Sequence, residues 1–194
     1  MKKISIVITA SGHAKRFGSN KLLAELNGKP VIQYTFEAIP ERIKKTIVVA
    51  WDREILDLAE SFGFTGVYND DKTDDPSITV KLGMGNLPED TDGCMLLVAD
   101  QPLLTKESLG NLCALFDENP SCICAVSENG EQRNPVIYPK SIFPEFMGLP
   151  PFERGKSIIK RHKDILQLYE IPDSRELMDV DCIEDLDKIQ GFHV

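Results

Sequence analysis

Residues 4–21 read ISIVITASGHAKRFGSNK, an apolar run followed at once by a loop with two glycines and three cations. A continuous apolar run at residues 4–9 is typical of a strand buried on both faces of a sheet. Glycine lets the backbone approach an anion closely, and Arg16 and Lys21 can neutralise that anion. The stretch therefore predicts a first strand that ends in a polyphosphate site, and so a protein that handles nucleotides.

Strand-like and helix-like segments alternate as far as Val126. Apolar runs at residues 46–50, 65–68, 95–99 and 121–126 predict strands, and the segments at residues 30–39, 55–62, 77–85 and 105–116 predict helices. Asp52 can cap the second of these helices, and Thr105 starts the last. This rhythm predicts a Rossmann-like three-layer α/β/α sandwich with a mostly parallel sheet. We expect a single domain that spans residues 1–194.

The rhythm changes after Val126. A turn signal at residues 128–131 precedes a short strand at residues 134–138, and several prolines interrupt the stretch that follows. Residues 154–162 and 183–189 predict helices, and residues 165–171 predict a further strand. We therefore expect an irregular excursion at about residues 127–160.

Composition excludes several classes of protein. The 194 residues carry a net charge of -9, with 42% hydrophobic and 27% charged residues, which is typical of a soluble globular chain with no nucleic-acid partner. No apolar run approaches the roughly 20 residues that span a bilayer. The first apolar stretch stops at Ala10, so we expect a strand rather than a signal peptide, and a cytoplasmic protein. The five cysteines include no CxxC pair and are expected to be reduced.

Two common nucleotide motifs are absent from the first loop. Gly12 and Gly18 are too far apart for GxGxxG, and no Gly-Lys-Ser/Thr follows as in a Walker A loop. A dinucleotide-dependent oxidoreductase is therefore disfavoured. The loop is nevertheless well placed, because ligands of α/β sheets bind at the carboxyl ends of the strands.

The loop resembles the signature of the MobA-like nucleotidyltransferases, Leu-Ala-Ala/Gly-Gly-x-Ser-x-Arg-Met-Gly-x-x-Lys. The matching positions are Ala10, Gly12, Arg16, Gly18 and Lys21, whereas Thr9, Ala14 and Phe17 depart from the pattern. The resemblance implies a fold of the nucleotide-diphospho-sugar transferase type. It also implies that Arg16 and Lys21 are catalytic residues on a triphosphate, and that residues 10–12 face the base and the ribose. The alternative is a solvated basic loop.

Asp100 closes the apolar run at residues 95–99. A carboxylate at the mouth of a buried strand needs a partner, and Mg²⁺ favours oxygen ligands beside phosphates. The triplet Asp100-Gln101-Pro102 also matches the metal-binding motif of the same family, which implies a catalytic, metal-binding and nucleotide-binding role for Asp100. Without a metal, Asp100 would simply cap a turn.

The acidic segment at residues 179–186 resembles the family pattern Asp-Ile-Asp-Thr-Pro-Glu-Asp-Leu. The resemblance implies that Asp181 is the second metal ligand, with Asp179 as the alternative. Asp181 and Asp185 could instead form the acidic start of the last helix.

The choice of nucleotide depends on Ser11. The chain resembles the molybdenum-cofactor cytidylyltransferase branch, because Ser11 stands where the guanylyltransferase branch has a glycine. A side chain there narrows the base pocket, which favours CTP. Thr79 matches a family serine in a segment that would hold the base and ribose, although Asp75 replaces the glycine at its start. An ordinary amphipathic helix turn would explain the same segment.

The acceptor region is matched less closely. Asn134-Pro135 matches a family motif, and residues 152–157 stand where the family has Gly-Asp-x-Gly-Ala-Arg, with Ser157 replacing the arginine. By resemblance, Asn134, Glu153 and Arg154 would contact the acceptor, and Arg154 and Lys156 supply positive charge. These cations could equally be solvated.

The expected reaction is Mg²⁺-dependent transfer of CMP from CTP to the phosphate of molybdopterin or molybdenum cofactor, with release of pyrophosphate. Use of GTP or of another phosphate acceptor is one alternative. A non-catalytic carrier that inserts the molybdenum cofactor into a molybdenum hydroxylase is another.

Overall fold

The computed structural model describes residues 1–12 and 20–192. The predicted site residue Arg16 and the matching Gly18 lie outside the described residues. Within the described ranges, seven strands form one sheet in the order β5-β4-β1-β6-β8-β7-β9. They are β1 Ile4–Ala10, β4 Lys45–Ala50, β5 Thr65–Tyr68, β6 Gly93–Val98, β7 Ile123–Glu128, β8 Glu131–Pro139 and β9 Leu166–Glu170. A separate ribbon pairs β2 (Glu25–Leu26) with β3 (Lys29–Pro30).

Strand β8 makes the sheet mixed. It pairs antiparallel with β6 and β7, whereas β1 with β4, β1 with β6, β4 with β5 and β7 with β9 are parallel pairs. The short strand expected at residues 134–138 is confirmed as part of β8, but β8 already begins at Glu131, so the irregular excursion expected at about residues 127–160 is wrong for residues 131–133. Residues 131–134 are polar because they lie near the tip of the β7–β8 hairpin, and this hides the first half of β8 from a hydrophobicity pattern.

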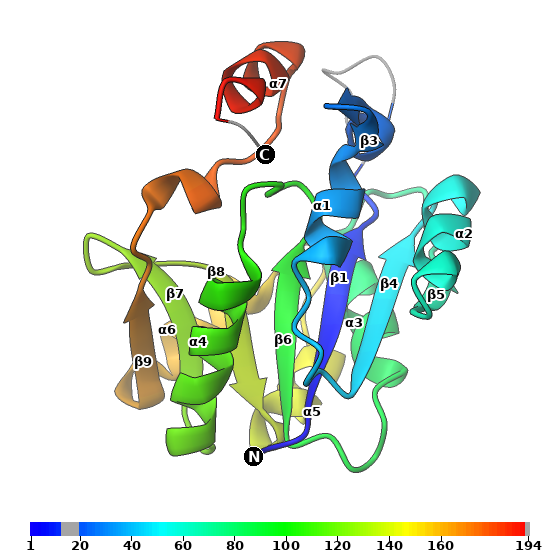
Figure 1. Cartoon of the computed structure of the whole chain (residues 1–194). Coiled ribbons are helices and arrows are strands. Elements are labelled where there is room, and N and C mark those ends of the chain that lie inside the picture. The colour runs from blue at the N-terminus through cyan, green and yellow to red at the C-terminus, as the bar shows by residue number, and fades with distance from the viewer. Residues whose placement is uncertain (13–19, 193–194) are drawn as a thin grey trace.

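Helices cover both faces of the sheet (Figure 1). One apolar cluster holds α1, α2 and α4 against the sheet, and a second holds α3, α5 and α6. The helices are α1 Val31–Glu37, α2 Arg53–Ser61, α3 Pro76–Gly85, α4 Lys106–Glu118, α5 Phe143–Met147, α6 Gly155–Arg161 and α7 Ile183–Gln190. The predicted α/β/α sandwich with a mostly parallel sheet is confirmed.

Side-chain oxygens begin several helices. Asp52 accepts a hydrogen bond from the Glu54 N–H at the start of α2, and Thr105 accepts one from Ser108 at the start of α4. Both caps stand where the sequence predicts a helix to begin. Such oxygens satisfy N–H groups that have no partner within the first turn.

The two faces of β1 pack against different layers. Ile4, Ile6 and Ile8 belong to the cluster with α1, whereas Val7 belongs to the cluster with α3. Gly83 permits the close approach of α3, because a Cβ at this position would lie 2.2 Å from the Val7 Cγ1 atom. Helix α3 is thereby held close against the middle of β1.

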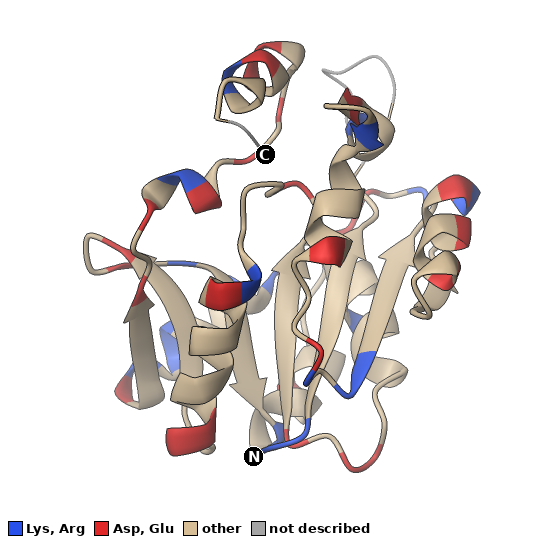
Figure 2. Cartoon of the chain, in the orientation of Figure 1, with Lys and Arg blue, Asp and Glu red and all other residues tan. Residues whose placement is uncertain are grey.

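The last helix lies above the carboxyl edge of the sheet, close to β3 (Figure 1). Leu186 and Ile189 of α7 join a third apolar cluster with Leu26, Val31 and Tyr34. Charged residues lie mainly on helices and loops, and few lie on the strands (Figure 2). Within the described residues, no helix is long and apolar enough to cross a membrane.

Candidate active site at the carboxyl edge of the sheet

A cavity of about 810 Å³ opens over the carboxyl ends of β1 and β6. Its wall is built from the end of β1, helix α3, the β7–β8 hairpin, the start of α6 and residues 177–179. The predicted site residues that line it are Ser11, Gly12, Lys21, Thr79, Asp100, Asn134 and Arg154. Ala10 is instead buried in the core, and Glu153 and Asp181 are not among the described residues of the wall.

Lys21 joins the two carboxylates predicted to bind metal. Its Nζ atom lies 2.7 Å from Asp100 Oδ2 and 3.0 Å from Asp181 Oδ1. Burial disfavours the charge on Lys21, but Asp100 and Asp181 outweigh it and hold the pKa of Lys21 above its usual value. The structure therefore brings residues from the first loop, from β6 and from the C-terminal segment to one point.

Asp179 lies beside this group. Gln101 donates from Nε2 to Asp179 Oδ1 at 3.0 Å, and the Val180 N–H donates to the Asp100 carbonyl at 2.9 Å. Burial, with the charge of Asp100 as the next cause, raises the pKa of Asp179. Both candidate metal ligands of this segment thus lie near Asp100. Asp179 lines the cavity, and Asp181 forms an ion pair with Lys21.

Glu176 fixes the C-terminal segment in this place, and sequence reasoning missed it. It lies in the short 3-10 turn η4 (Ser174–Leu177) and is only 6% exposed. Its carboxylate accepts from the Thr105 N–H at 2.8 Å, from Thr105 Oγ1 at 2.7 Å and from Ser108 Oγ at 3.0 Å. The segment that carries Asp179 and Asp181 is therefore anchored on the first turn of α4.

The opposite wall carries polar side chains that suit a base and a ribose. Ser11 donates from Oγ to the Val49 carbonyl at 3.1 Å, which draws its hydroxyl towards β4. Asn69 donates from Nδ2 to Thr79 Oγ1 at 3.1 Å, and Asn69 is only 4% exposed. Thr79 was predicted and Asn69 was not, because nothing in the polar stretch at residues 69–76 distinguishes Asn69 from its neighbours.

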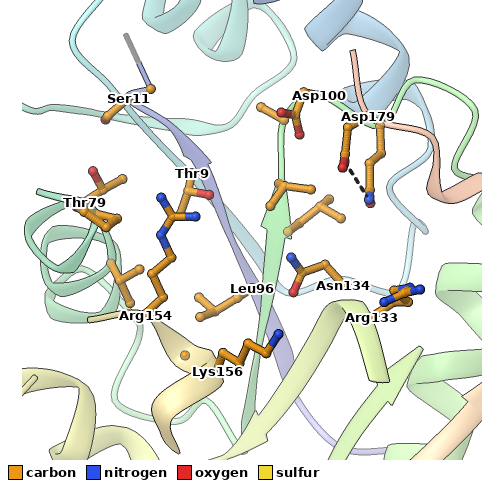
Figure 3. A pocket seen from close by; sticks show the side chains of 18 of the residues that line it. Thr9, Ser11, Thr79, Leu96, Asp100, Arg133, Asn134, Arg154, Lys156 and Asp179 are labelled. Carbon is orange, nitrogen blue, oxygen red and sulfur yellow. Dashed lines mark hydrogen bonds between the residues drawn. The ribbon is translucent and has the colours of Figure 1, made fainter. Parts of the chain in front are cut away.

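Cations line the side of the cavity away from Asp100. Figure 3 shows Arg154 and Lys156 on one side of the cavity, next to Leu96, and Asp100 and Asp179 on the other side. No carboxylate within residues 1–12 and 20–192 forms an ion pair with Arg154 or Lys156. These two side chains are therefore available to an anionic ligand.

The neighbouring residues of this region are engaged elsewhere. Arg133 lines the cavity but also pairs with Glu128 at 3.2 Å and with Glu131 at 3.5 Å. Glu153 is half-buried, with its Oε2 atom 4.0 Å from Arg161 Nη1. Of the three residues predicted to contact the acceptor, the structure brings Asn134 and Arg154 into the cavity wall but not Glu153.

Comparison with known proteins gives a consistent result. A family model described as a MobA-like NTP transferase domain matches residues 6–165. A molybdenum cofactor guanylyltransferase from Shewanella sp. strain ANA-3 is 35% identical over 138 residues, which cover 70% of this chain and 67% of that protein. A 3-deoxy-manno-octulosonate cytidylyltransferase from Francisella philomiragia is 28% identical over 174 residues, covering 81% and 68%.

The fold has a solved counterpart. The crystal structure of Rv0371c from Mycobacterium tuberculosis H37Rv matches with a TM-score of 0.80 and 17% identity, covering 98% of both chains. At this identity the match supports the fold alone. The curated relatives include guanylyltransferases for the molybdenum cofactor, so they do not single out the cytidylyltransferase branch predicted from Ser11.

Proposed function

The chain belongs to the MobA-like NTP transferase family, and from this premise we propose that it transfers a nucleoside monophosphate from an NTP to the terminal phosphate of molybdopterin or molybdenum cofactor. A phosphate oxygen of the acceptor forms a new bond to the α-phosphorus of the NTP. The bond between the α-phosphorus and the bridging oxygen breaks, and pyrophosphate leaves. No protein nucleophile takes part, so the protein acts by positioning and by neutralising charge.

The observation that carries this proposal is the division of charge across one cavity. Asp100 and Lys21 lie on one side, where a triphosphate and its metal would be held, and Arg154 and Lys156 lie on the other. An acceptor phosphate held by these two cations would face the α-phosphorus across the apolar floor at Leu96. Lys21, and by resemblance Arg16, would stabilise negative charge on the triphosphate in the transition state.

The carboxylates fit a magnesium ion. Asp100 and Asp181 already share one cation, the ammonium group of Lys21. Among the described residues, no three His, Cys, Asp or Glu side chains form a complete metal cage. Such an incomplete set suits Mg²⁺, which takes one or two carboxylates and completes its shell with water and substrate phosphates. Asp100 and Asp181 would hold the ion, which supplies positive charge to the phosphate oxygens.

Two nucleotides are candidate donors. GTP is supported by the molybdenum cofactor guanylyltransferases, which include a relative that is 35% identical to the chain. CTP is supported by the side chain of Ser11 at the cavity wall, and a cytidylyltransferase is among the relatives. Because the Ser11 hydroxyl is turned to the Val49 carbonyl, the methylene group and not the hydroxyl would narrow the base pocket.

The deciding experiment measures pyrophosphate release with Mg²⁺ and molybdopterin or molybdenum cofactor, with GTP, CTP, ATP and UTP supplied separately. Asp100→Ala should lower the rate by about 10²-fold or more, because it removes a group that neutralises transition-state charge. Asp57→Ala, on the exposed face of α2, is the matched control and should retain the wild-type rate.

Each result has a separate meaning. Release with one nucleotide that is lost in Asp100→Ala identifies the donor and supports the proposed reaction. If pyrophosphate is released only when a sugar or alcohol phosphate replaces the pterin, the protein is still a nucleotidyltransferase, but its acceptor belongs to another class. Binding of molybdenum cofactor without release from any nucleotide contradicts the proposal and favours a carrier that serves a molybdenum hydroxylase.

A further inference from the structure

Asp75 contacts two segments that are far apart in sequence. Its carboxylate is only 6% exposed, and its Oδ1 atom accepts from the Ser77 N–H and from the Phe152 N–H, each at 2.8 Å. The first bond caps helix α3, and the second reaches the loop that leads into α6. One buried oxygen thus joins the helix that carries Thr79 to the loop that carries Arg154.

A second bond holds the same two segments together. Lys81, on α3, donates from Nζ to the Leu149 carbonyl at 2.7 Å. The loop between residues 149 and 154 is therefore tied to α3 near both of its ends, at Leu149 and at Phe152. We call residues 149–156 the acceptor arm, because this stretch ends with the two cavity cations.

The backbone of Phe152 adopts a conformation that is unusual for a residue other than glycine. Its φ angle is +64°, in the left-handed region that side chains other than glycine rarely adopt, and it is 65% exposed. An exposed side chain provides little packing to keep the backbone there. Two hydrogen bonds hold it there: one from its N–H to the buried Asp75 carboxylate, and the turn bond from the Glu153 N–H to the Pro150 carbonyl at 3.2 Å.

We propose that Asp75 is a positioning residue that sets the distance between the nucleotide wall of the cavity and the acceptor cations. This inference rests on the proposed function, in which Thr79 faces the nucleotide and Arg154 and Lys156 hold the acceptor phosphate. Asp75 lines the cavity, and its Oδ1 atom is taken up by the N–H groups of Ser77 and Phe152. It acts by fixing the acceptor arm to α3, so its loss should weaken acceptor binding and leave nucleotide binding in place.

Three substitutions separate this role from the capping of α3. Asp75→Ser keeps a good helix cap but is too short to bridge to Phe152 as well. Asp75→Asn keeps an acceptor oxygen at the same position, so it should preserve both bonds and keep the acceptor arm in place. Lys81→Met removes the tie to Leu149 alone.

The first measurement is hydrogen exchange, which needs no substrate. In Asp75→Ser, amides of the acceptor arm should exchange about tenfold or more faster than in the wild type, with α3 unchanged, because one anchoring hydrogen bond is lost. In Asp75→Asn, the amides of the acceptor arm should exchange at the wild-type rate. In Lys81→Met, the amides around Leu149 should exchange faster. An acceptor arm that exchanges at the wild-type rate in Asp75→Ser would overturn the proposal.

The second measurement separates KM for the acceptor from KM for the nucleotide. Asp75→Ser should raise KM for molybdopterin about tenfold, the value of one hydrogen bond, and change KM for the NTP by less than about twofold. An equal rise in both constants would mean a general structural role and would contradict positioning. If the wild type transfers to no acceptor, the proposed function fails, and hydrogen exchange still decides whether Asp75 holds the arm.

Discussion

Lys21 and Asp100, 79 positions apart in sequence, form an ion pair of 2.7 Å at the edge of the cavity. The same ammonium group lies 3.0 Å from Asp181. A lysine thus occupies the space between two carboxylates that would bind a metal ion. A metal ion at these carboxylates would compete with the lysine for their oxygens until a triphosphate gave Lys21 another anion to contact.

Replacing Lys21 should therefore strengthen metal binding in the absence of nucleotide. We expect Lys21→Met to bind Mn²⁺ roughly tenfold more tightly than the wild type, because a competing charge beside the carboxylates is removed. Electron paramagnetic resonance of free Mn²⁺ measures this directly. Lys29→Met, which removes a surface pair with Glu37, is the control. Equal or weaker Mn²⁺ binding in Lys21→Met would contradict the competition.

Removing the Glu176 carboxylate should destabilise the protein. Glu176→Ala leaves the buried Ser108 hydroxyl and the Thr105 N–H without their acceptor, which costs about 1–3 kcal/mol of unfolding free energy. Glu176→Gln retains an oxygen and should cost less. Urea denaturation measures both, with the 96% exposed Glu41 replaced by alanine as a control that stays near the wild type. A Glu176→Ala curve that overlays this control would disprove the anchoring role.

Crowding at Gly83 gives a test of the contact between α3 and β1. Gly83→Ala would place Cβ 2.2 Å from Val7 Cγ1, so we expect a loss of about 1–3 kcal/mol from overpacking. Gly85→Ala, in the same helix with no atom within 4 Å of the added Cβ, should be neutral or stabilising. The double variant Val7→Ala/Gly83→Ala should be more stable than the sum of the single effects. Strict additivity, measured by denaturation of all variants, would argue against this contact.

Asp75 should also make stability depend on pH. Burial alone would raise its pKa, but hydrogen bonds from the Ser77 and Phe152 N–H groups outweigh it and lower the pKa below 3.8. A carboxyl with a lowered pKa in the folded state stabilises the protein above about pH 4, and the effect is lost as the pH falls through the folded pKa. The difference in unfolding free energy between wild type and Asp75→Asn should be constant from pH 5 to pH 8 and shrink towards pH 3. A difference independent of pH would refute this assignment.

The sequence predicted the elements whose signals are local. The apolar run of β1, the cap at Asp52 and the carboxylate at the end of β6 all follow from neighbouring residues. Helix α5 was missed, because Pro144 was interpreted as a break although proline is well tolerated in a first helical turn. The first half of β8 was missed, because its polar residues show no apolar pattern. They are seen to form a strand only through their pairing with β7.

Site residues could be predicted where a single residue or a short motif identifies them. They could not be predicted where the role depends on a contact between two residues far apart in sequence. Asp100, Thr79 and Arg154 are three of the predicted site residues, and the structure brings all three to the cavity wall, whereas their roles stay predictions. The contacts of Glu176 with Thr105 span 71 positions, and that of Asp75 with Phe152 spans 77. Hydrogen bonds over such separations leave no periodic signal in a single sequence, so these supporting residues appear only once the chain is folded.

The antiparallel β8 also has a consequence for the order in which the chain can fold during synthesis. Strands β1, β4, β5 and β6 neighbour one another and are complete once residue 98 has been made. Strand β7 is made next, but it joins the sheet only through β8, which follows it. The wall with Thr9 and Asp100 can therefore form on the ribosome well before the wall with Arg154, so the two halves of the cavity are built at different times during synthesis.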